Sequence, residues 1–519
     1  MLSAAPYGNI LLTGNDLTFE QFYAVALEGS KVSLAPAAEQ RMNASRTVVD
    51  KLVASRETAY GINSGFGKLA SVRISAEQVR QLQVNLVRSH ACGVGPPLNE
   101  AQTRGMMLLR ANALAKGFSG IRPTIVEMLC DMLNAKVHPV IPSQGSVGAS
   151  GDLAPLAHLA QVMIGEGRVA FQGKTLAGGE ALRRAGIRPL ALEAKEGLSL
   201  LNGTQGMLAL LSLALRQADI LTDTADVAAA LSLDALRGSP GAFDPRITEV
   251  RPYAGAAQTA RNLARLNAGS QIRESHRSVQ RDPRVQDPYS LRCTPQVHGS
   301  VRDTLASARQ IAAVELNSAT DNPLVFVSVS AGALGGEIIS GGNFHGQPLA
   351  MVADHVAIAM ATLGGIVERR IEKMTNPHTS MLPAFLTPEP GLNSGFMIAQ
   401  VTAAALTSEN KALALPHSVD SIPTSGDQED YVSMGMSAAR RLDRMLENLQ
   451  PTLAIELLCA CQGIDLLAPL ETGTLAKHAY NLVRSKSAKL TADRALAAEI
   501  EAVAELVASG AFSAILSQS

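Results

Sequence analysis

Stretches in which apolar residues recur every three or four positions dominate this chain. In one of them, the apolar face of a helix would consist of Val301, Leu305, Ala308, Ala312 and Leu316. The same spacing predicts further helices over residues 205–236, 346–374, 397–415 and 434–465. Strand-like alternation is rare and short; residues 169–172, followed by Gly173, predict one hairpin. The sequence therefore predicts an all-α protein.

The composition agrees with a core of close-packed helices. Aromatic residues make up 3% of the chain and Trp is absent, so Ala, Leu, Ile, Val and Met must fill the core. Gly-rich or Pro-rich breaks are dense before residue 200, and long helical patterns prevail after it. We therefore expect a loop-rich N-terminal domain over residues 1–200 and a long helical bundle over residues 201–519. Apolar helix faces of this length usually need partners, which predicts an oligomer.

Charge and targeting features argue against several classes of partner. The 45 basic and 46 acidic residues give a net charge of −1, so nothing favours nucleic acid or an anionic membrane. The N-terminus has no basic region before its apolar residues, and the apolar runs at 207–215 and 356–367 are shorter than the roughly 20 residues of a membrane span. Five scattered cysteines are typical of reduced thiols in the cytoplasm. The sequence contains no CxxC motif, no HExxH motif and no pair of histidines at helical spacing, so it predicts no metal site.

Residues 145–160, GSVGASGDLAPLAHLA, place several small residues before an apolar periodic run. The glycine spacing around Ser150 does not fit a nucleophile elbow, and Gly173-Lys174-Thr175 has its preceding glycine one residue too far away for a phosphate-binding loop. Ser150 and Asp152 are good N-cap residues, so we expect a helix to start here.

The same residues permit a chemical interpretation. Gly151 has no Cβ, so its backbone nitrogen can approach the carbonyl carbon of Ala149 closely. Ring closure between them, with loss of water from Ser150, would give a five-membered ring with an exocyclic double bond. Such a ring is a strong electrophile and needs no external cofactor. The residues alone leave open whether the loop is only a helix cap or also this electrophile.

Several motifs together resemble one family. Ala149-Ser150-Gly151 resembles the triplet that forms the methylidene-imidazolone prosthetic group of the aromatic amino-acid ammonia-lyase and aminomutase family. Further motifs resemble those of the family, in family order: YGINSGFG from Tyr60, LNGT from Leu201, QDPYSLRC from Gln286, GGNFH from Gly341 and NSGFM from Asn393. The resemblance implies a helical architecture similar to that of fumarases and aspartases. It also implies a homotetramer whose active sites collect residues from several subunits.

Within the family, several segments are similar to the histidine ammonia-lyase branch. They are Ser89-His90, SENKALA from Ser408, SVDS from Ser418 and Gln428-Glu429-Asp430. This similarity implies elimination of ammonia from L-histidine to give trans-urocanate. Tyrosine-specific relatives also have a histidine at the position of His90, so a tyrosine ammonia-lyase or aminomutase is an alternative. A non-enzymatic helical scaffold that binds anions at helix N-termini is a third.

The sequence departs from that branch at a few positions. Asp427 and Tyr431 stand where the branch usually has Asn and His. Gly346-Gln347 replaces Ala-Glu, and His417 lies in a segment that usually reads His-Pro-Ala. These departures bear on specificity and rate.

The resemblance also implies roles for individual residues. Ala149, Ser150 and Gly151 would become the electrophile, and Tyr60 would remove the β-proton, which requires a pKa below the usual value of about 10. Glu429 would accept a proton or hydrogen bond from the substrate. Tyr289 would assist catalysis by stabilising charge on the prosthetic group.

Substrate binding would involve a second set of residues. Arg292 would hold the carboxylate with its planar guanidinium group. Asn202 and Gln286 would orient the substrate. The substrate side chain would contact Ser89, His90 and Phe344.

Overall fold

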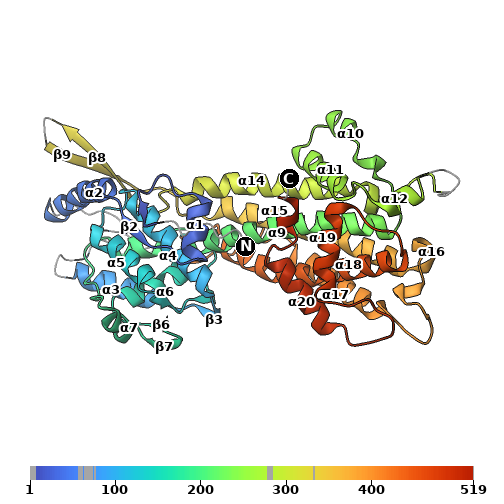
Figure 1. Cartoon of the computed structure of the whole chain (residues 1–519). Coiled ribbons are helices and arrows are strands. Elements are labelled where there is room, and N and C mark those ends of the chain that lie inside the picture. Colours follow the sequence, from blue (N-terminus) through green and yellow to red (C-terminus); the bar gives the residue numbers. More distant parts are fainter. Residues whose placement is uncertain are drawn as a thin grey trace. The chain divides into compact units, whose positions relative to one another are not determined.

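The computed structural model describes residues 8–55, 62, 74, 78–277, 284–330 and 333–517. The chain forms two compact units. The first consists of Met1–Leu213, Arg309–Asp354 and Pro416–Arg440, and the second of Ala214–Ala308, His355–Leu415 and Arg441–Ser519. Helices make up most of the described residues (Figure 1), which confirms the all-α prediction.

The longest helices lie where the apolar spacing predicts them. They are α9 (Gln205–Ala235), α14 (Thr294–Leu316), α15 (Gln347–Thr375), α17 (Met397–Leu413) and α18 (Gly435–Leu466). The predicted bounds differ from the observed ones by a few residues at most. A helix of 31 residues such as α9 is about 46 Å long. Such helices carry one apolar surface over a long distance.

Mostly short helices lie in the N-terminal part of the first unit. They are α1 (Phe19–Ala26), α2 (Pro36–Ser55), α3 (Val79–His90), α4 (Glu100–Ala115), α5 (Pro123–Asn134), α6 (Leu153–Met163), α7 (Gly178–Ala185) and α8 (Glu196–Leu201). Helix α4 is buried along nearly its whole length and packs against α1 and α5. Its buried Arg110 donates hydrogen bonds to Gln205 and to the carbonyl of Ser199, which satisfies part of its charge inside the core.

Four small sheets complete the described part of the first unit. Strand β1 (Ile10–Leu12) pairs with β2 (Val32–Leu34) in parallel, and three antiparallel sheets follow. Their strands are β3 (Val94–Pro97) with β5 (Pro142–Gln144), β4 (His138–Pro139) with β6 (Arg168–Phe171) and β7 (Lys174–Ala177), and β8 (Leu324–Ser330) with β9 (Ala333–Ile339). The β6–β7 pair confirms the predicted hairpin.

The shorter helices of the second unit lie between the long helices or follow α18. They are η2 (Pro240–Phe243), α10 (Pro245–Glu249), α11 (Ala254–Leu266), α12 (Gln271–Ser275), α13 (Tyr289–Arg292), α16 (Pro377–Ser380), η3 (Ala384–Leu386), α19 (Thr474–Arg484), α20 (Ala497–Ala508) and α21 (Ser513–Leu516). Charged side chains inside this unit are paired. Arg370 binds Glu456, and Asp226 binds His298 and Arg302, because an unpaired buried charge would be strongly destabilising.

Helix α15 is long and apolar enough to cross a membrane, with a mean hydropathy of 1.7 in its most apolar window. However, 61% of that window is buried inside the protein. A buried core helix has the same length and composition, so this helix is weak evidence for a membrane span.

Candidate active site

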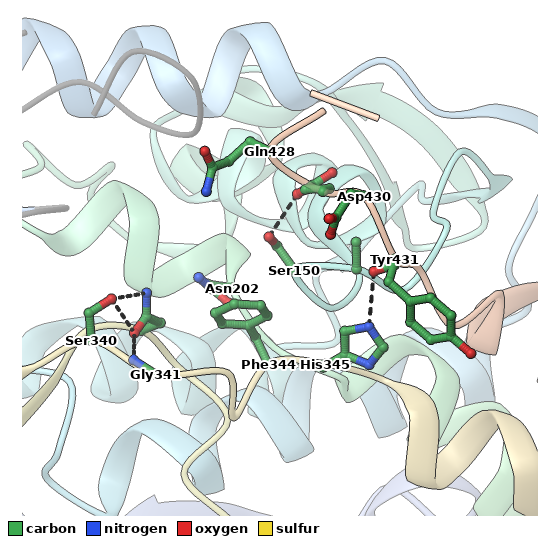
Figure 2. A pocket seen from close by; sticks show the side chains of 12 residues that line it. Ser150, Asn202, Ser340, Gly341, Phe344, His345, Gln428, Asp430 and Tyr431 are labelled. Carbon is green, nitrogen blue, oxygen red and sulfur yellow. Dashed lines mark hydrogen bonds between the residues drawn. The ribbon is translucent and has the colours of Figure 1, made fainter. Parts of the chain in front are cut away.

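A pocket of about 410 Å³ opens beside Ser150 in the first unit. Figure 2 shows Ser150, Asn202, Phe344 and Gln428 around this opening. The lining residues are Ala149, Ser150, Asn202, Asn322, Ser340, Gly341, Phe344, His345, Gln428, Glu429, Asp430 and Tyr431. The pocket thus brings together five residues that the sequence proposes for the site: Ala149, Ser150, Asn202, Phe344 and Glu429.

The loop that carries Ser150 is held in a conformation that requires glycine. Gly151 has a φ of +71°, and a Cβ there would lie 2.1 Å from the carbonyl oxygen of Gly203. The same carbonyl accepts a hydrogen bond from the backbone nitrogen of Asp152 at 2.7 Å. Ala149 is buried and Ser150 is half-buried at the pocket. The backbone of Gly203 is therefore in direct contact with the segment that the sequence proposes as an electrophile.

Asp152 precedes α6, but its side chain does not cap the helix. Its carboxylate instead accepts hydrogen bonds from the Ser146 hydroxyl at 2.9 Å and the backbone nitrogen of Met207 at 2.8 Å. The helix start is predicted correctly, whereas the capping role of Ser150 and Asp152 is wrong, because both side chains bond elsewhere. Burial raises the pKa of Asp152 to about 6, although these hydrogen bonds oppose the shift.

Asp152 predicts a specific pH dependence of stability. In the folded protein the pKa of Asp152 is about 6, whereas the pKa of an aspartate in an unfolded chain is about 3.9. Between these two pH values the folded state binds more protons than the unfolded state. The contribution of protonated Asp152 to stability is therefore lost as the pH rises. Relative to Asp152→Asn, the wild-type free energy of unfolding should fall by about 3 kcal/mol between about pH 4 and pH 7. Urea unfolding followed by far-UV circular dichroism measures it; parallel pH curves for the two proteins would contradict it.

Glu429 is fixed against Ser150 by hydrogen bonds to both carboxylate oxygens. The Ser150 hydroxyl donates to Oε1 at 2.8 Å, and the Thr424 hydroxyl donates to Oε2 at 2.7 Å. The backbones of Thr424 and Glu429 also exchange hydrogen bonds of 2.9 and 3.3 Å. The carboxylate is therefore oriented toward Ser150 by the turn on which it lies.

His90 is the last residue of α3, and neither it nor Ser89 lines the pocket. Its Nδ1 donates to the Leu86 carbonyl at 2.9 Å, which leaves Nε2 as the acceptor. Burial lowers the pKa of His90, and the Leu86 carbonyl and the Glu429 charge oppose that shift. The imidazole of His90 is therefore neutral at neutral pH. The charge of Glu429 acts on this ring.

Asn202 presents an unused acceptor at the pocket. The residue is only 3% exposed, and its Oδ1 has no hydrogen-bond partner among the described residues. Since buried polar atoms are rarely left unpaired, this oxygen is suited to receive a donor from a bound molecule.

The sequence missed one polar wall of the pocket. The Asn322 carboxamide oxygen accepts from the backbone nitrogen of Gly341 at 2.7 Å and lies 3.2 Å from the Ser340 hydroxyl. Figure 2 labels Ser340 and Gly341 on this wall. Asn322 belongs to none of the motifs that the sequence analysis singles out. Only its position in the fold, beside the GGNFH motif, indicates a place at the site.

The structure shows the surroundings of two departures from the histidine branch, Gly346 and Tyr431. A Cβ at Gly346 would lie 2.6 Å from the Met207 methyl carbon and 2.8 Å from the Ser433 hydroxyl. An alanine there, as the branch usually has, would need the Met207 and Ser433 side chains to shift. Tyr431 accepts a hydrogen bond at its carbonyl from His345 Nε2, at 3.1 Å, and the two rings stack with centroids 6.1 Å apart.

The remaining predicted site residues lie outside this pocket. Gln286, Tyr289 and Arg292 belong to the second unit. The Arg292 guanidinium lies 4.5 Å from the centre of the Tyr289 ring, and its Nε is buried without a hydrogen-bond partner among the described residues. Tyr60 falls outside the described residues, so its role stays a prediction.

Comparisons with known proteins agree with the motifs. A sequence model of the family described as "Aromatic amino acid lyase" matches residues 17–485. A histidine ammonia-lyase from Koribacter versatilis is 54% identical over 510 residues, covering 97% of this chain and 98% of its own. Another from Myxococcus xanthus is 51% identical over 501 residues, covering 96% and 97% of the two chains.

Solved structures extend the similarity to the fold. The crystal structure of histidine ammonia-lyase from Trypanosoma cruzi is 44% identical, with a TM-score of 0.89, and covers 98% of this chain and 95% of its own. The tyrosine aminomutase from Streptomyces globisporus is 38% identical, with a TM-score of 0.92 and coverage of 98% on both sides. These matches span nearly the whole chain and confirm the resemblance that the motifs indicate. The chain therefore belongs to the aromatic amino acid lyase family.

Proposed function

We propose that this chain eliminates ammonia from L-histidine and releases trans-urocanate. Glu429 carries the proposal, because its fixed carboxylate lies at the pocket beside Ser150 and close to the neutral His90. An imidazole ring carries one N–H donor when neutral and two when protonated, and both the Glu429 carboxylate and Nε2 of the neutral His90 are acceptors for them. The full-length similarity to proteins named histidine ammonia-lyase supports the same substrate.

The pocket fits a prosthetic group made from Ala149-Ser150-Gly151. The left-handed Gly151 has no space for a Cβ, and Ser150 projects into the pocket. The unpaired Oδ1 of Asn202 is a polar contact for the group or for the substrate amine. When formed, this methylidene-imidazolone supplies an electrophile that helps ammonia to leave.

The chain's own residues manage the protons and the orientation of the substrate. Tyr60 removes the β-proton, for which nearby positive charge or hydrogen bonds must lower its pKa from about 10. Glu429, with both oxygens oriented by hydrogen bonds, accepts a proton or hydrogen bond from the substrate amine or imidazole. Phe344 packs beside the substrate and limits access of water.

We also propose a homotetramer in which other copies of the chain complete each pocket. Arg292 would bind the substrate carboxylate, and its buried, unpartnered Nε supports this role. Gln286 and Tyr289, next to it in sequence, would accompany it. A cytoplasmic location agrees with the five free cysteines.

A tyrosine-specific lyase or aminomutase is the second candidate. The similarity to the Streptomyces globisporus tyrosine aminomutase favours it, and a histidine such as His90 would also suit a phenolic ring. The anion-binding scaffold is less well supported, because the full-length similarity is to proteins named as lyases and aminomutases.

Product analysis separates these functions. The purified protein is incubated with L-histidine or L-tyrosine, and ammonia, urocanate, coumarate and β-tyrosine are measured. We expect ammonia and urocanate in equal amounts from L-histidine. Formation of β-tyrosine without urocanate would establish the aminomutase instead, and no reaction with either amino acid would overturn the enzymatic proposal.

A further inference from the structure

The hydroxyl group of Ser150 is hydrogen-bonded to a carboxyl group that is placed to protonate it as it leaves. Formation of the proposed prosthetic group requires this hydroxyl to leave, and its oxygen lies 2.8 Å from Glu429 Oε1. We infer that Glu429, held by Thr424, is the general acid that dehydrates Ser150 during formation of the electrophile. The inference rests on the proposed function but adds a step that precedes any encounter with substrate.

The chemistry of the leaving group requires such an acid. Hydroxide is a poor leaving group, since its conjugate acid, water, has a pKa of about 15.7. A positioned proton donor therefore accelerates its departure. The buried Asp152 also lies close to the loop, but its carboxyl group is engaged by Ser146 and the backbone of Met207. Glu429 is the carboxyl group that contacts the departing oxygen.

The step balances without an oxidant, a reductant or another reactant. After the nitrogen of Gly151 has bonded to the carbonyl carbon of Ala149 and that oxygen has left as water, the Cα proton of Ser150 passes to solvent. The electron pair of its C–H bond forms the Cα=Cβ double bond, and the Cβ–O bond breaks. When Oε1 of Glu429 carries a proton, its hydrogen bond with Ser150 is reversed, and Glu429 gives that proton to the departing oxygen, which leaves as a second water. Solvent then reprotonates the carboxylate.

The hydrogen bond between Ser150 and Glu429 can exist only before the prosthetic group has formed. Ser150 loses its hydroxyl in the mature group, so the contact between Ser150 and Glu429 exists only in the precursor. Once that contact has gone, Oε1 is free to face the substrate, whereas Thr424 still holds Oε2. One carboxyl group can therefore serve first in maturation and then in turnover.

The test is the intact mass of Glu429→Gln, which keeps the shape of the side chain but has no proton to give. Wild type is expected to be two waters lighter than the translated chain. Freshly folded Glu429→Gln is expected to retain the Ser150 hydroxyl, with second-water loss slowed at least about 100-fold. Peptide mapping across residues 145–160 locates the remaining hydroxyl.

Asp427→Asn is the matched control, because it removes one carboxylate from the same turn and lies outside the pocket lining. Its φ of +65° is one that asparagine tolerates. It should mature at the wild-type rate. Thr424→Val should slow maturation roughly fivefold, because Glu429 loses one orienting hydrogen bond; this also provides the test if Glu429→Gln does not fold.

The outcomes separate this inference from the proposed function. Loss of both waters at the wild-type rate in Glu429→Gln would overturn the role of Glu429 in maturation but leave the lyase proposal standing. If Glu429→Gln does not fold, maturation of Thr424→Val at the wild-type rate would overturn the role of Glu429 in maturation. A wild-type mass equal to that of the translated chain would overturn the prosthetic group itself.

Discussion

Replacing Ser150 with alanine is expected to reduce the rate of urocanate formation by at least about 10⁴-fold. The variant cannot lose the Ser150 hydroxyl as water, so the exocyclic double bond of the electrophile cannot form. Without that electrophile, ammonia must leave as a poor leaving group next to a weakly acidic C–H bond. The absorbance of urocanate, recorded with saturating L-histidine, measures the effect.

Ser143→Ala is a suitable control for Ser150→Ala. Ser143 lies in β5, is buried, and its hydroxyl has no hydrogen-bond partner among the described residues. Its removal should leave the rate within about twofold of wild type, because little is lost when an unpaired hydroxyl is deleted. Substantial activity in Ser150→Ala would mean that another group activates the substrate.

Gly151→Ala should have the largest structural effect on the loop. The new Cβ would lie 2.1 Å from the Gly203 carbonyl oxygen, in a residue with a φ of +71°. The left-handed conformation and the clash together should lower the free energy of unfolding by at least about 2 kcal/mol. The displaced loop should also fail to cyclise, so intact mass should show no loss of water.

Gly173→Ala separates backbone strain from the clash. Gly173 has a φ of +74°, but a Cβ there would have no atom within 4 Å. This variant should lose only about 1 kcal/mol of stability and should mature normally. Equal effects of the two substitutions on stability and maturation would show that the close contact with Gly203 does not matter.

Local sequence patterns predict the helices well because helical periodicity depends on neighbours in the chain. Helices α9, α15 and α18 follow apolar repeats whose ends are marked by glycine, proline or polar residues. The same patterns cannot show that Arg309–Asp354 and Pro416–Arg440 pack with the N-terminal residues in one unit. That association depends on contacts between residues far apart in the chain.

The site illustrates the same limit at the level of side chains. Ala149, Asn202, Phe344 and Glu429 meet at one pocket as their motifs indicate. Local rules predict a capping role for Asp152, yet its carboxylate bonds to the backbone of Met207, 55 residues later. The fixed orientation of Glu429 toward Ser150 is equally invisible in the sequence, since 279 residues separate the two.

The most direct test of the account is the ratio of kcat/KM for L-histidine to kcat/KM for L-tyrosine, measured on the purified wild-type protein. The fixed Glu429 predicts a ratio of at least about 10³, because the phenolic ring of tyrosine leaves the Glu429 carboxylate unpaired even where the phenolic hydroxyl donates to His90. A ratio below one would contradict the assignment of histidine as the substrate.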